Sequence, residues 1–173
     1  DFIRKGTQNG HSKLFFLQLD IKGFFMEIHK PTLIKILSKK LNHELLLWLS
    51  QTIILHNPVF DFRYRGKMQK KNILPPHKTL FHPDQKRGIA IGNLTSQFFA
   101  NLYLNEMDQF VKRGLGVKYY LRYVDDFILL SHNPEELMEW KEKITDYLKE
   151  KLKLSLKEPD KTPISVYRGI DFL

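Results

Sequence analysis

The sequence contains no cysteine, which excludes disulfide bonds and every zinc site that is built on cysteine ligands. No apolar run approaches the roughly 20 residues that a helix needs to cross a bilayer. The first residues show no secretory signal pattern, and neither an internal repeat nor a low-complexity tract is present. These absences predict a protein without disulfide bonds, cysteine-based zinc sites or a membrane partner.

What the sequence does contain is enough apolar material for a core and an excess of positive charge. The 173 residues are 42% hydrophobic and 13% aromatic, which fits one compact domain. Lysine and arginine outnumber aspartate and glutamate by 28 to 19, so the net charge is +9. This excess suits a polyanionic partner such as nucleic acid, although a basic surface that only aids solubility explains it equally well. Because the chain starts at Asp1 and stops at Leu173 inside an apolar run, we expect it to be cut from a longer protein.

Apolar periodicity predicts strands and helices in a mixed order. Strand-length apolar runs cover residues 14–19, 119–124 and 127–131, and residues 153–157 and 164–173 predict further strands. Helical patterns cover residues 31–40, 43–55, 94–113 and 134–151. Residues 56–88 hold four prolines and a basic run, and we expect an irregular insertion with one hairpin. The order predicts an α+β fold, with helices on one face of an antiparallel sheet.

The predicted helix starts depend on capping residues. Asn42 is the expected N-cap of the helix at 43–55, and Pro31 suits the first turn of the helix before it. Asn133, followed by Pro134 and two glutamates, predicts a strong start for the helix at 134–151.

Two adjacent carboxylates, Asp125 and Asp126, stand between two apolar runs of strand length. Every other residue from Tyr119 to Leu130 is apolar or aromatic except Arg122. Burying unpaired carboxylates costs several kcal/mol each, so such a pair favours a bound cation. A turn also favours aspartate for local reasons, which explains one of the two better than both.

A third carboxylate, Asp20, ends the apolar run at 14–19. If this strand lies beside the hairpin, three carboxylates converge at one edge of the sheet. Oxygen-rich clusters of this kind bind Mg²⁺ or Mn²⁺ together with substrate phosphates. Two such ions support in-line phosphoryl transfer, because one activates the attacking hydroxyl and the other neutralises the leaving pyrophosphate. Sequence spacing alone does not show that the two strands are neighbours.

Three segments, in this order along the chain, resemble the palm motifs of reverse transcriptases. Residues 19–25 (LDIKGFF) resemble the first motif, residues 87–97 (RGIAIGNLTSQ) the next, and Tyr123-Val124-Asp125-Asp126 the third. The resemblance covers nearly the whole chain and implies an RNA-directed DNA polymerase, a nucleotidyltransferase with the right-hand polymerase palm. It implies two Mg²⁺ ions, with Mn²⁺ as the alternative, deoxynucleoside triphosphates, an RNA template and a DNA primer. Asp20, Ile21, Asp125 and Asp126 are then the metal-binding residues.

The same resemblance assigns two positions near the nucleotide. Phe25 lies where the family places an aromatic gate under the sugar, which excludes a ribose 2′-OH; the alternative is a core phenylalanine. We expect Phe24 to fill that core role, because neighbours on an extended chain face opposite ways. Gly92 lies where the backbone approaches the nascent base pair, and only a residue without Cβ allows this. A plain turn before the helix explains Gly92 equally well.

Three basic residues are assigned by resemblance as well. Lys161 matches the lysine of a fourth motif, which meets the leaving pyrophosphate as a general acid, although a surface lysine is the more frequent meaning of such a residue. Arg4 and Lys5 match the end of a fingers motif that contacts the triphosphate. Residues 1–13 are then a remnant of the fingers attached to a palm that covers 1–173. Most of the fingers and the thumb are absent, and residues 169–173 resemble the start of the primer-grip hairpin.

Residues 91–108 (IGNLTSQFFANLYLNEMD) resemble the reverse transcriptases of diversity-generating retroelements in bacteria and phages. This implies a cytoplasmic enzyme, a templating repeat RNA, an accessory protein and error-prone copying of adenines. Ile91 and Gln97 stand where many relatives carry Gln and Pro, and we expect them to pack against the templating base pair. The alternative is that both merely suit the start of the helix at Leu94.

Two other functions remain open at this point. One is a different bacterial reverse transcriptase, of the retron, group II intron or phage-defence type. The other is a non-catalytic RNA-binding module on a decayed palm, against which the intact Asp20, Asp125 and Asp126 argue.

Overall fold

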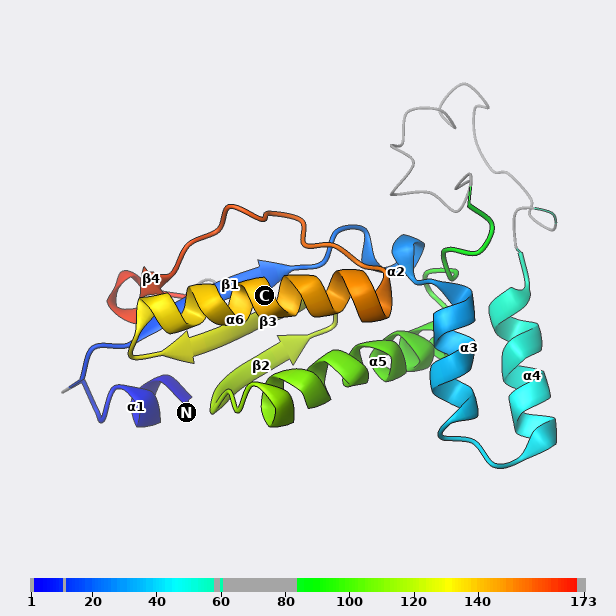
Figure 1. Cartoon of the computed structure of the whole chain (residues 1–173), viewed down its shortest axis with the longest axis horizontal. Coiled ribbons are helices and arrows are strands. Elements are labelled where there is room, and N and C mark those ends of the chain that lie inside the picture. Colours follow the sequence, from blue (N-terminus) through cyan, green and yellow to red (C-terminus); the bar gives the residue numbers. More distant parts are fainter. Residues whose placement is uncertain (1, 11, 58–59, 61–83, 171–173) are drawn as a thin grey trace, which may run out of the picture. The chain divides into compact units, whose positions relative to one another are not determined.

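The computed structural model describes residues 2–10, 12–57, 60 and 84–170 (Figure 1). Its chain divides into two compact units, which are described separately below. We call the first the sheet unit; it comprises Asp1–Lys22, Leu104–Lys151 and Ser155–Leu173. We call the second the helical unit; it comprises Gly23–Tyr103 and Leu152–Leu154.

Four antiparallel strands form the centre of the sheet unit, in the order β2-β3-β1-β4. The strands are β1 (Phe15–Asp20), β2 (Tyr119–Tyr123), β3 (Asp126–Ser131) and β4 (Ile164–Ser165). The first three confirm the predicted strands to within one residue. Helices with an antiparallel sheet also confirm the α+β class.

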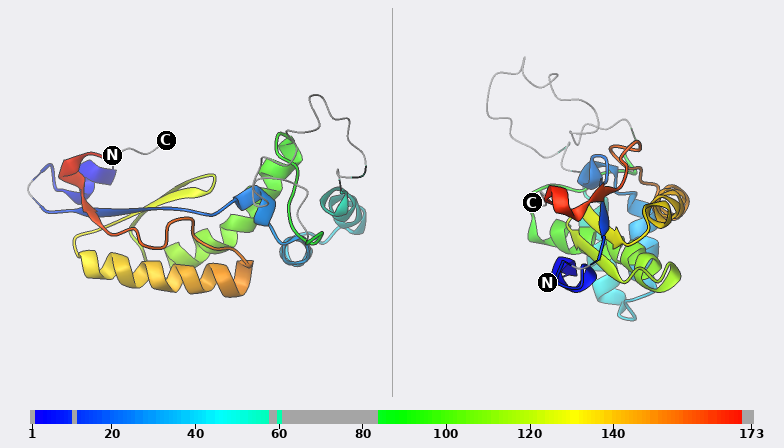
Figure 2. Two further views of the ribbon diagram at one scale, coloured as in Figure 1. Left: turned by 90° about the horizontal axis from the view of Figure 1, so that it is seen from above. Right: turned by 90° about the vertical axis from the view of Figure 1, so that its left-hand side faces the viewer.

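One face of the central strands is buried along the length of β1, and the other is buried at the end where β1 begins. On one face Leu17, Leu19, Phe127 and Leu129 are at most 1% exposed, and α6 (Pro134–Tyr147) packs against β1 and β3. On the other face a cluster contains Leu14, Phe16, Ile128, Leu130 and Val166. Figure 2 shows α6 and the turn at Val166–Arg168 on opposite sides of β1. Each such buried side chain contributes about 1.5–3 kcal/mol of transfer free energy.

The cover on the second face depends on β4, which pairs with β1 only at Phe15 and Phe16. β1 runs on for four more residues to Asp20. Since a strand rises about 3.3 Å per residue, the end of β1 at Asp20 lies more than about 10 Å beyond this pairing. The end of the sheet that carries Asp20 is therefore held by the strand pairing and is not covered by β4.

The helix starts follow the capping rules, with one correction. The Asn133 side chain accepts a hydrogen bond from the Glu135 amide at 2.9 Å, which confirms the predicted start of α6. In the helical unit α4 (Glu44–Leu55) is capped by His43, whose Nδ1 accepts from the Leu46 amide at 3.4 Å. The prediction of Asn42 as the cap was wrong. The helix begins at Glu44 rather than at residue 43, so the cap position falls on His43.

Three of the remaining helices, α3 (Lys30–Ser38), α5 (Leu94–Gln109) and α6, agree with the predicted ranges, and two short helices, α1 (Phe2–Gly6) and α2 (Phe24–Glu27), were not predicted. α5 continues into a π-helical turn at Phe110–Gly114 (η4), and α6 continues into another at Leu148–Leu152 (η5). Two helical-unit elements are α2 and α3, and α3 packs against α4 (Figure 1). The short α1 precedes the sheet. No helix among the described residues is long and apolar enough to span a membrane.

The predicted strand at 153–157 was wrong. Leu152, Leu154 and Leu156 are buried in alternation, as the pattern indicated, but Lys153 has a left-handed backbone with φ 56°. Instead of a ladder, this segment forms an isolated β-bridge between Ile21 and Leu156. The predicted strand at 164–173 shrinks to β4 and a 3₁₀ turn at Val166–Arg168 (η6), and residues 171–173 lie outside the described part.

The predicted insertion at 56–88 and its hairpin lie largely outside the described residues. The assignment of residues 1–13 to the fingers stays a prediction.

Candidate functional site

Asp20 and Asp126 are the last residue pair in the ladder between β1 and β3. Directly paired residues of antiparallel strands lie on the same face of the sheet, with Cβ atoms about 4.5–5.5 Å apart. The Asp20 side chain is 17% exposed. The two strands therefore bring together two of the three carboxylates that sequence spacing alone had not joined.

Asp125 lies in the turn that joins β2 to β3. Tyr123 pairs with Asp126, so the two turn residues are Val124 and Asp125. The prediction that Asp125 and Asp126 form the turn was wrong by one residue, because the ladder closes at Asp126 and makes it the first residue of β3. Val124 has φ 55°, a left-handed conformation that is rare for a β-branched residue and costs about 1–3 kcal/mol.

The carboxylates act on one another electrostatically. Burial raises the pKa of Asp125, and the charges of Asp20 and Asp126 raise it further. Burial also raises the pKa of Asp126, followed by the charge of Asp20. Ionised carboxylates at this edge of the sheet are thus costly for the protein alone, which favours a nearby cation.

Such a cation is present in the form of Lys157, which the sequence patterns did not predict. Its Nζ donates to a carboxylate oxygen of Asp20 at 2.7 Å, and its amide donates to the Asp20 carbonyl at 2.8 Å. The charge of Lys157 also offsets part of the rise in the pKa of both Asp125 and Asp126. The alternation at 153–157 was the available signal, but it does not reveal that Leu156 bridges Ile21.

The donor set fits a hard divalent cation in its chemistry, because carboxylate oxygens are the ligands that Mg²⁺ and Mn²⁺ prefer. Within the described part of the chain, however, no three histidine or acidic side chains are grouped closely enough to hold a metal ion. Metal binding by Asp20, Ile21, Asp125 and Asp126 therefore stays a prediction. The in-register carboxylates and the ammonium group already paired with one of them support it.

The other basic candidates among the described residues, Lys161, Arg4 and Lys5, do not pair with the aspartates of the site as Lys157 does. Lys161 pairs with Glu158 at 3.2 Å, and its charge lowers the pKa of Asp126. Arg4 and Lys5 lie on α1, at the end of the sheet where β1 begins and opposite the end that carries Asp20 (Figure 1). The Arg4 Nε donates to Asn9 at 2.9 Å. Contact of Arg4 and Lys5 with a triphosphate stays a prediction.

The helical unit brings the first two motifs together. The Phe25 carbonyl accepts a hydrogen bond from the Ile89 amide at 2.9 Å. Phe24 is 2% exposed and Phe25 is half-buried, so Phe24 is the core residue as expected, although both lie on α2 and not on an extended chain. The role of Phe25 at the sugar stays a prediction.

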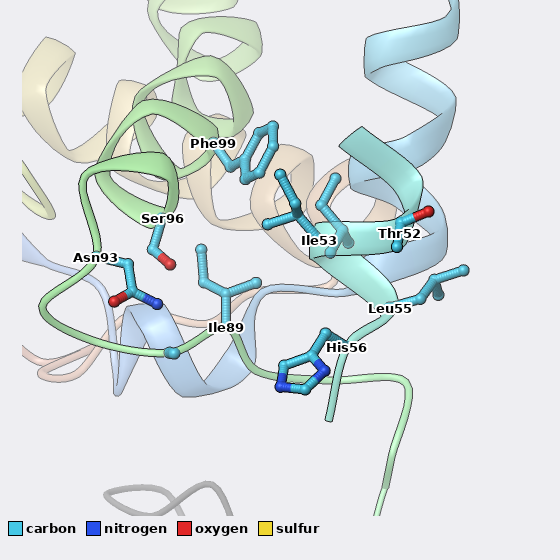
Figure 3. A pocket seen from close by; sticks show the side chains of 10 residues that line it. Thr52, Ile53, Leu55, His56, Ile89, Asn93, Ser96 and Phe99 are labelled. Atoms are coloured by element: carbon cyan, nitrogen blue, oxygen red, sulfur yellow. The ribbon is translucent and has the colours of Figure 1, made fainter. Parts of the chain in front are cut away.

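Ile91, Gly92 and Gln97 are exposed at the turn and the first helical residues that follow the Ile89 contact. Gly92 has φ 97°, and a Cβ there would meet nothing within 4 Å, so the backbone conformation is the reason for glycine at this position. A pocket of about 610 Å³ lies beside this turn in the same unit (Figure 3). It is lined by the end of α4 and the residue after it (Thr52–His56), by Ile89, Ala90, Asn93 and Ser96 of the second motif, and by Phe99 of α5.

Comparisons with known proteins agree with the fold and with the family that the three motifs resemble. A search of curated proteins finds no match. The telomerase of Candida tropicalis, solved with a TWJ fragment of telomeric RNA, matches 99% of this chain with a TM-score of 0.57 and 15% identity. The chain spans 29% of that telomerase chain, and at this identity the likeness shows the palm-type fold alone. A family model described as reverse transcriptase (RNA-dependent DNA polymerase) matches residues 3–173, so the chain belongs to the reverse transcriptase family.

Proposed function

We propose that the complete protein is an RNA-directed DNA polymerase that adds deoxynucleotides to a DNA primer on an RNA template. The observation that carries this proposal is the cross-strand pair of Asp20 and Asp126, next to Asp125, in a chain of the reverse transcriptase family. Reverse transcriptases use divalent metal ions, and the acidic edge of the sheet is the site that suits them.

In this proposal Asp20, Ile21, Asp125 and Asp126 bind two Mg²⁺ ions. When bound, the ions supply activation of the primer 3′-hydroxyl and neutralisation of the departing pyrophosphate. Asp20, Asp125 and Asp126 also hold the reacting groups in line, since phosphoryl transfer depends mainly on positioning and electrostatics. Lys161 donates a proton to the pyrophosphate, and its charge already acts on Asp126.

Substrate binding in this proposal uses the helical unit and the basic charge. Phe25 and Gly92 contact the deoxynucleotide and the nascent base pair. The net charge of +9 supports binding of the RNA template and the primer through their phosphates.

The finer assignment is to a diversity-generating retroelement of a bacterium or phage. The segment at 91–108 supports it by resemblance, and the side chains of Ile91 and Gln97 are exposed, as contact with a base pair requires. This assignment predicts an accessory protein partner and frequent errors opposite template adenine.

Primer extension by the complete protein tests the proposal. We expect a DNA primer on an RNA template to be extended with deoxynucleotides in Mg²⁺ or Mn²⁺, and extension to stop in EDTA. RNA binding without extension in either metal would instead indicate a non-catalytic RNA-binding palm. Extension with equal error rates at all four template bases would favour a retron, group II intron or phage-defence enzyme over the retroelement assignment.

A further inference from the structure

An ion pair in the sheet unit joins the helix α5 to the strand β2. The Arg122 guanidinium donates to both carboxylate oxygens of Asp108, from Nε to Oδ1 at 2.8 Å and from Nη2 to Oδ2 at 2.6 Å. The Tyr120 hydroxyl donates to the same carboxylate at 2.6 Å. The Arg122 and Asp108 side chains are only 12% and 24% exposed. A bidentate pair with this burial is better ordered than an exposed surface pair.

The same guanidinium also contacts the turn that carries Asp125. Arg122 Nη1 donates to the Val124 carbonyl at 2.7 Å. Val124 is the residue with φ 55°, one position before Asp125 and two before Asp126. A β-branched residue does not adopt this conformation by itself, so the surrounding contacts must maintain it.

We propose that Asp108 and Arg122 are positioning residues that hold the Val124–Asp125 turn, and with it the carboxylates of Asp125 and Asp126, in the orientation needed for nucleotide addition. The proposal rests on the polymerase function proposed above. Asp108 fixes the planar guanidinium through two bonds, which leaves the third nitrogen directed at the Val124 carbonyl. Neither residue is expected to touch substrate, so they act through the backbone of the turn.

Arginine is required here for a geometric reason. Its planar fork makes three directed bonds at once, whereas the ammonium of lysine is a point charge that cannot span both Asp108 oxygens and the carbonyl. A displacement of about 1 Å at a catalytic group lowers turnover by about 10²-fold. Loss of the Asp108–Arg122 pair is therefore expected to act on turnover more than on substrate affinity.

The test uses Arg122→Lys, Arg122→Met and Asp108→Asn in the complete protein, assayed below the unfolding temperature of every variant. We expect kcat for primer extension to fall by about tenfold or more, with KM for the nucleotide changed by less than about threefold. Tyr120→Phe is the matched control, because it removes one bond to the same Asp108 carboxylate and leaves the guanidinium in place. Its kcat is expected to stay within about twofold of wild type.

Val124→Gly separates positioning from a general loss of stability. Glycine adopts positive φ without strain, so the turn should no longer need Arg122. We expect Arg122→Met to lower kcat much less in the Val124→Gly background than in wild type. Equal losses in both backgrounds, or full activity of the Arg122 variants, would overturn the proposal.

Hydrogen exchange provides a readout that does not depend on activity. Arg122→Lys should speed amide exchange at residues 123–126 more than Tyr120→Phe does, and equal protection in the two variants would also overturn the inference. Failure of the polymerase assignment gives a different result, since the wild-type protein would then not extend a primer while the exchange difference persisted.

Discussion

Lys157 and Asp20 are 137 residues apart in the sequence, yet the Lys157 Nζ lies 2.7 Å from a carboxylate oxygen of Asp20. The contact exists because the chain after α6 returns along β1, where the Ser155 carbonyl accepts from the Lys22 amide and the Lys157 amide donates to the Asp20 carbonyl. A lysine thus serves as a counterion to the acidic edge of the sheet. Because that edge is also the expected metal site, we expect lysine and metal to compete for the Asp20 carboxylate.

This competition predicts the effect of Lys157→Met on metal binding. Removing the ammonium group frees Asp20 and removes a positive charge near the ion, so Mn²⁺ should bind about two- to fivefold more tightly, as expected for an exposed ion pair. Lys143→Met is the control, because Lys143 pairs with Glu139 on α6 and its charge does not shift the pKa of Asp125 or Asp126, so it should change the affinity less. Isothermal titration calorimetry measures both, and weaker Mn²⁺ binding by Lys157→Met would show that the two cations do not compete.

The raised pKa values of Asp125 and Asp126 predict a pH dependence of stability in the absence of metal. A carboxyl group whose pKa is higher in the folded state favours folding at low pH, and this contribution is lost as pH rises from the ordinary value of 3.8 through the raised pKa. Asp125→Asn should therefore stabilise the metal-free protein at pH 7, by up to about 1 kcal/mol after allowance for solvent screening, and by less at about pH 3.

Urea unfolding in EDTA at the two pH values measures this difference. Asp160→Asn, at an exposed position of the same unit, is the matched control. A destabilised Asp125→Asn at pH 7 would show that the carboxylate is not a cost to the metal-free fold.

Phe25 is expected to select the sugar of the incoming nucleotide. Phe25→Val should raise ribonucleotide incorporation relative to deoxynucleotide by about tenfold or more, because it removes a clash with the 2′-OH. Phe24→Ala should instead destabilise the fold by about 3–5 kcal/mol, since Phe24 is 2% exposed. Competition assays with both nucleotide types decide this; sugar selection that depends on Phe24 and not on Phe25 would mean that the register is wrong by one.

Ile91 is expected to contribute to errors opposite template adenine. Its side chain is 67% exposed, and an aliphatic group there makes no polar contact with the base pair. Ile91→Gln should lower misincorporation opposite adenine by about two- to tenfold, because polymerases reject mispairs partly through shape and unpaired polar groups. Sequencing of cDNA from a defined RNA template measures this, and an unchanged error spectrum would remove Ile91 from the explanation.

Local patterns in the sequence predicted the elements well, because alternation and periodicity report burial on one face. They predicted β1, α5, α6 and the hairpin strands, and Asn133 predicted a helix start to the residue. The errors occurred where tertiary contacts decide. Because Tyr123 pairs with Asp126, the turn lies one residue earlier than predicted. Alternation predicted a strand at 153–157, but the left-handed backbone of Lys153 is incompatible with one.

The sequence predicted the three aspartates of the candidate site but not the residues that contact them or hold their turn. Asp20, Asp125 and Asp126 are visible as acids at the ends of apolar runs, and the motif order joins them by resemblance. Lys157, Asp108 and Arg122 carry no such signal, because each reaches the site through a contact between elements far apart in the chain or through a side chain whose direction only the fold sets.

Primer extension by Asp20→Asn and Asp125→Asn tests the central claim most directly. Asparagine preserves shape and removes charge, so both variants of the complete protein should fold, while the loss of metal-based stabilisation should lower extension on an RNA template by at least about 10³-fold. Asp160→Asn should extend the primer like wild type. Near-wild-type extension by either Asp20→Asn or Asp125→Asn would contradict the assignment of these carboxylates to a catalytic metal site.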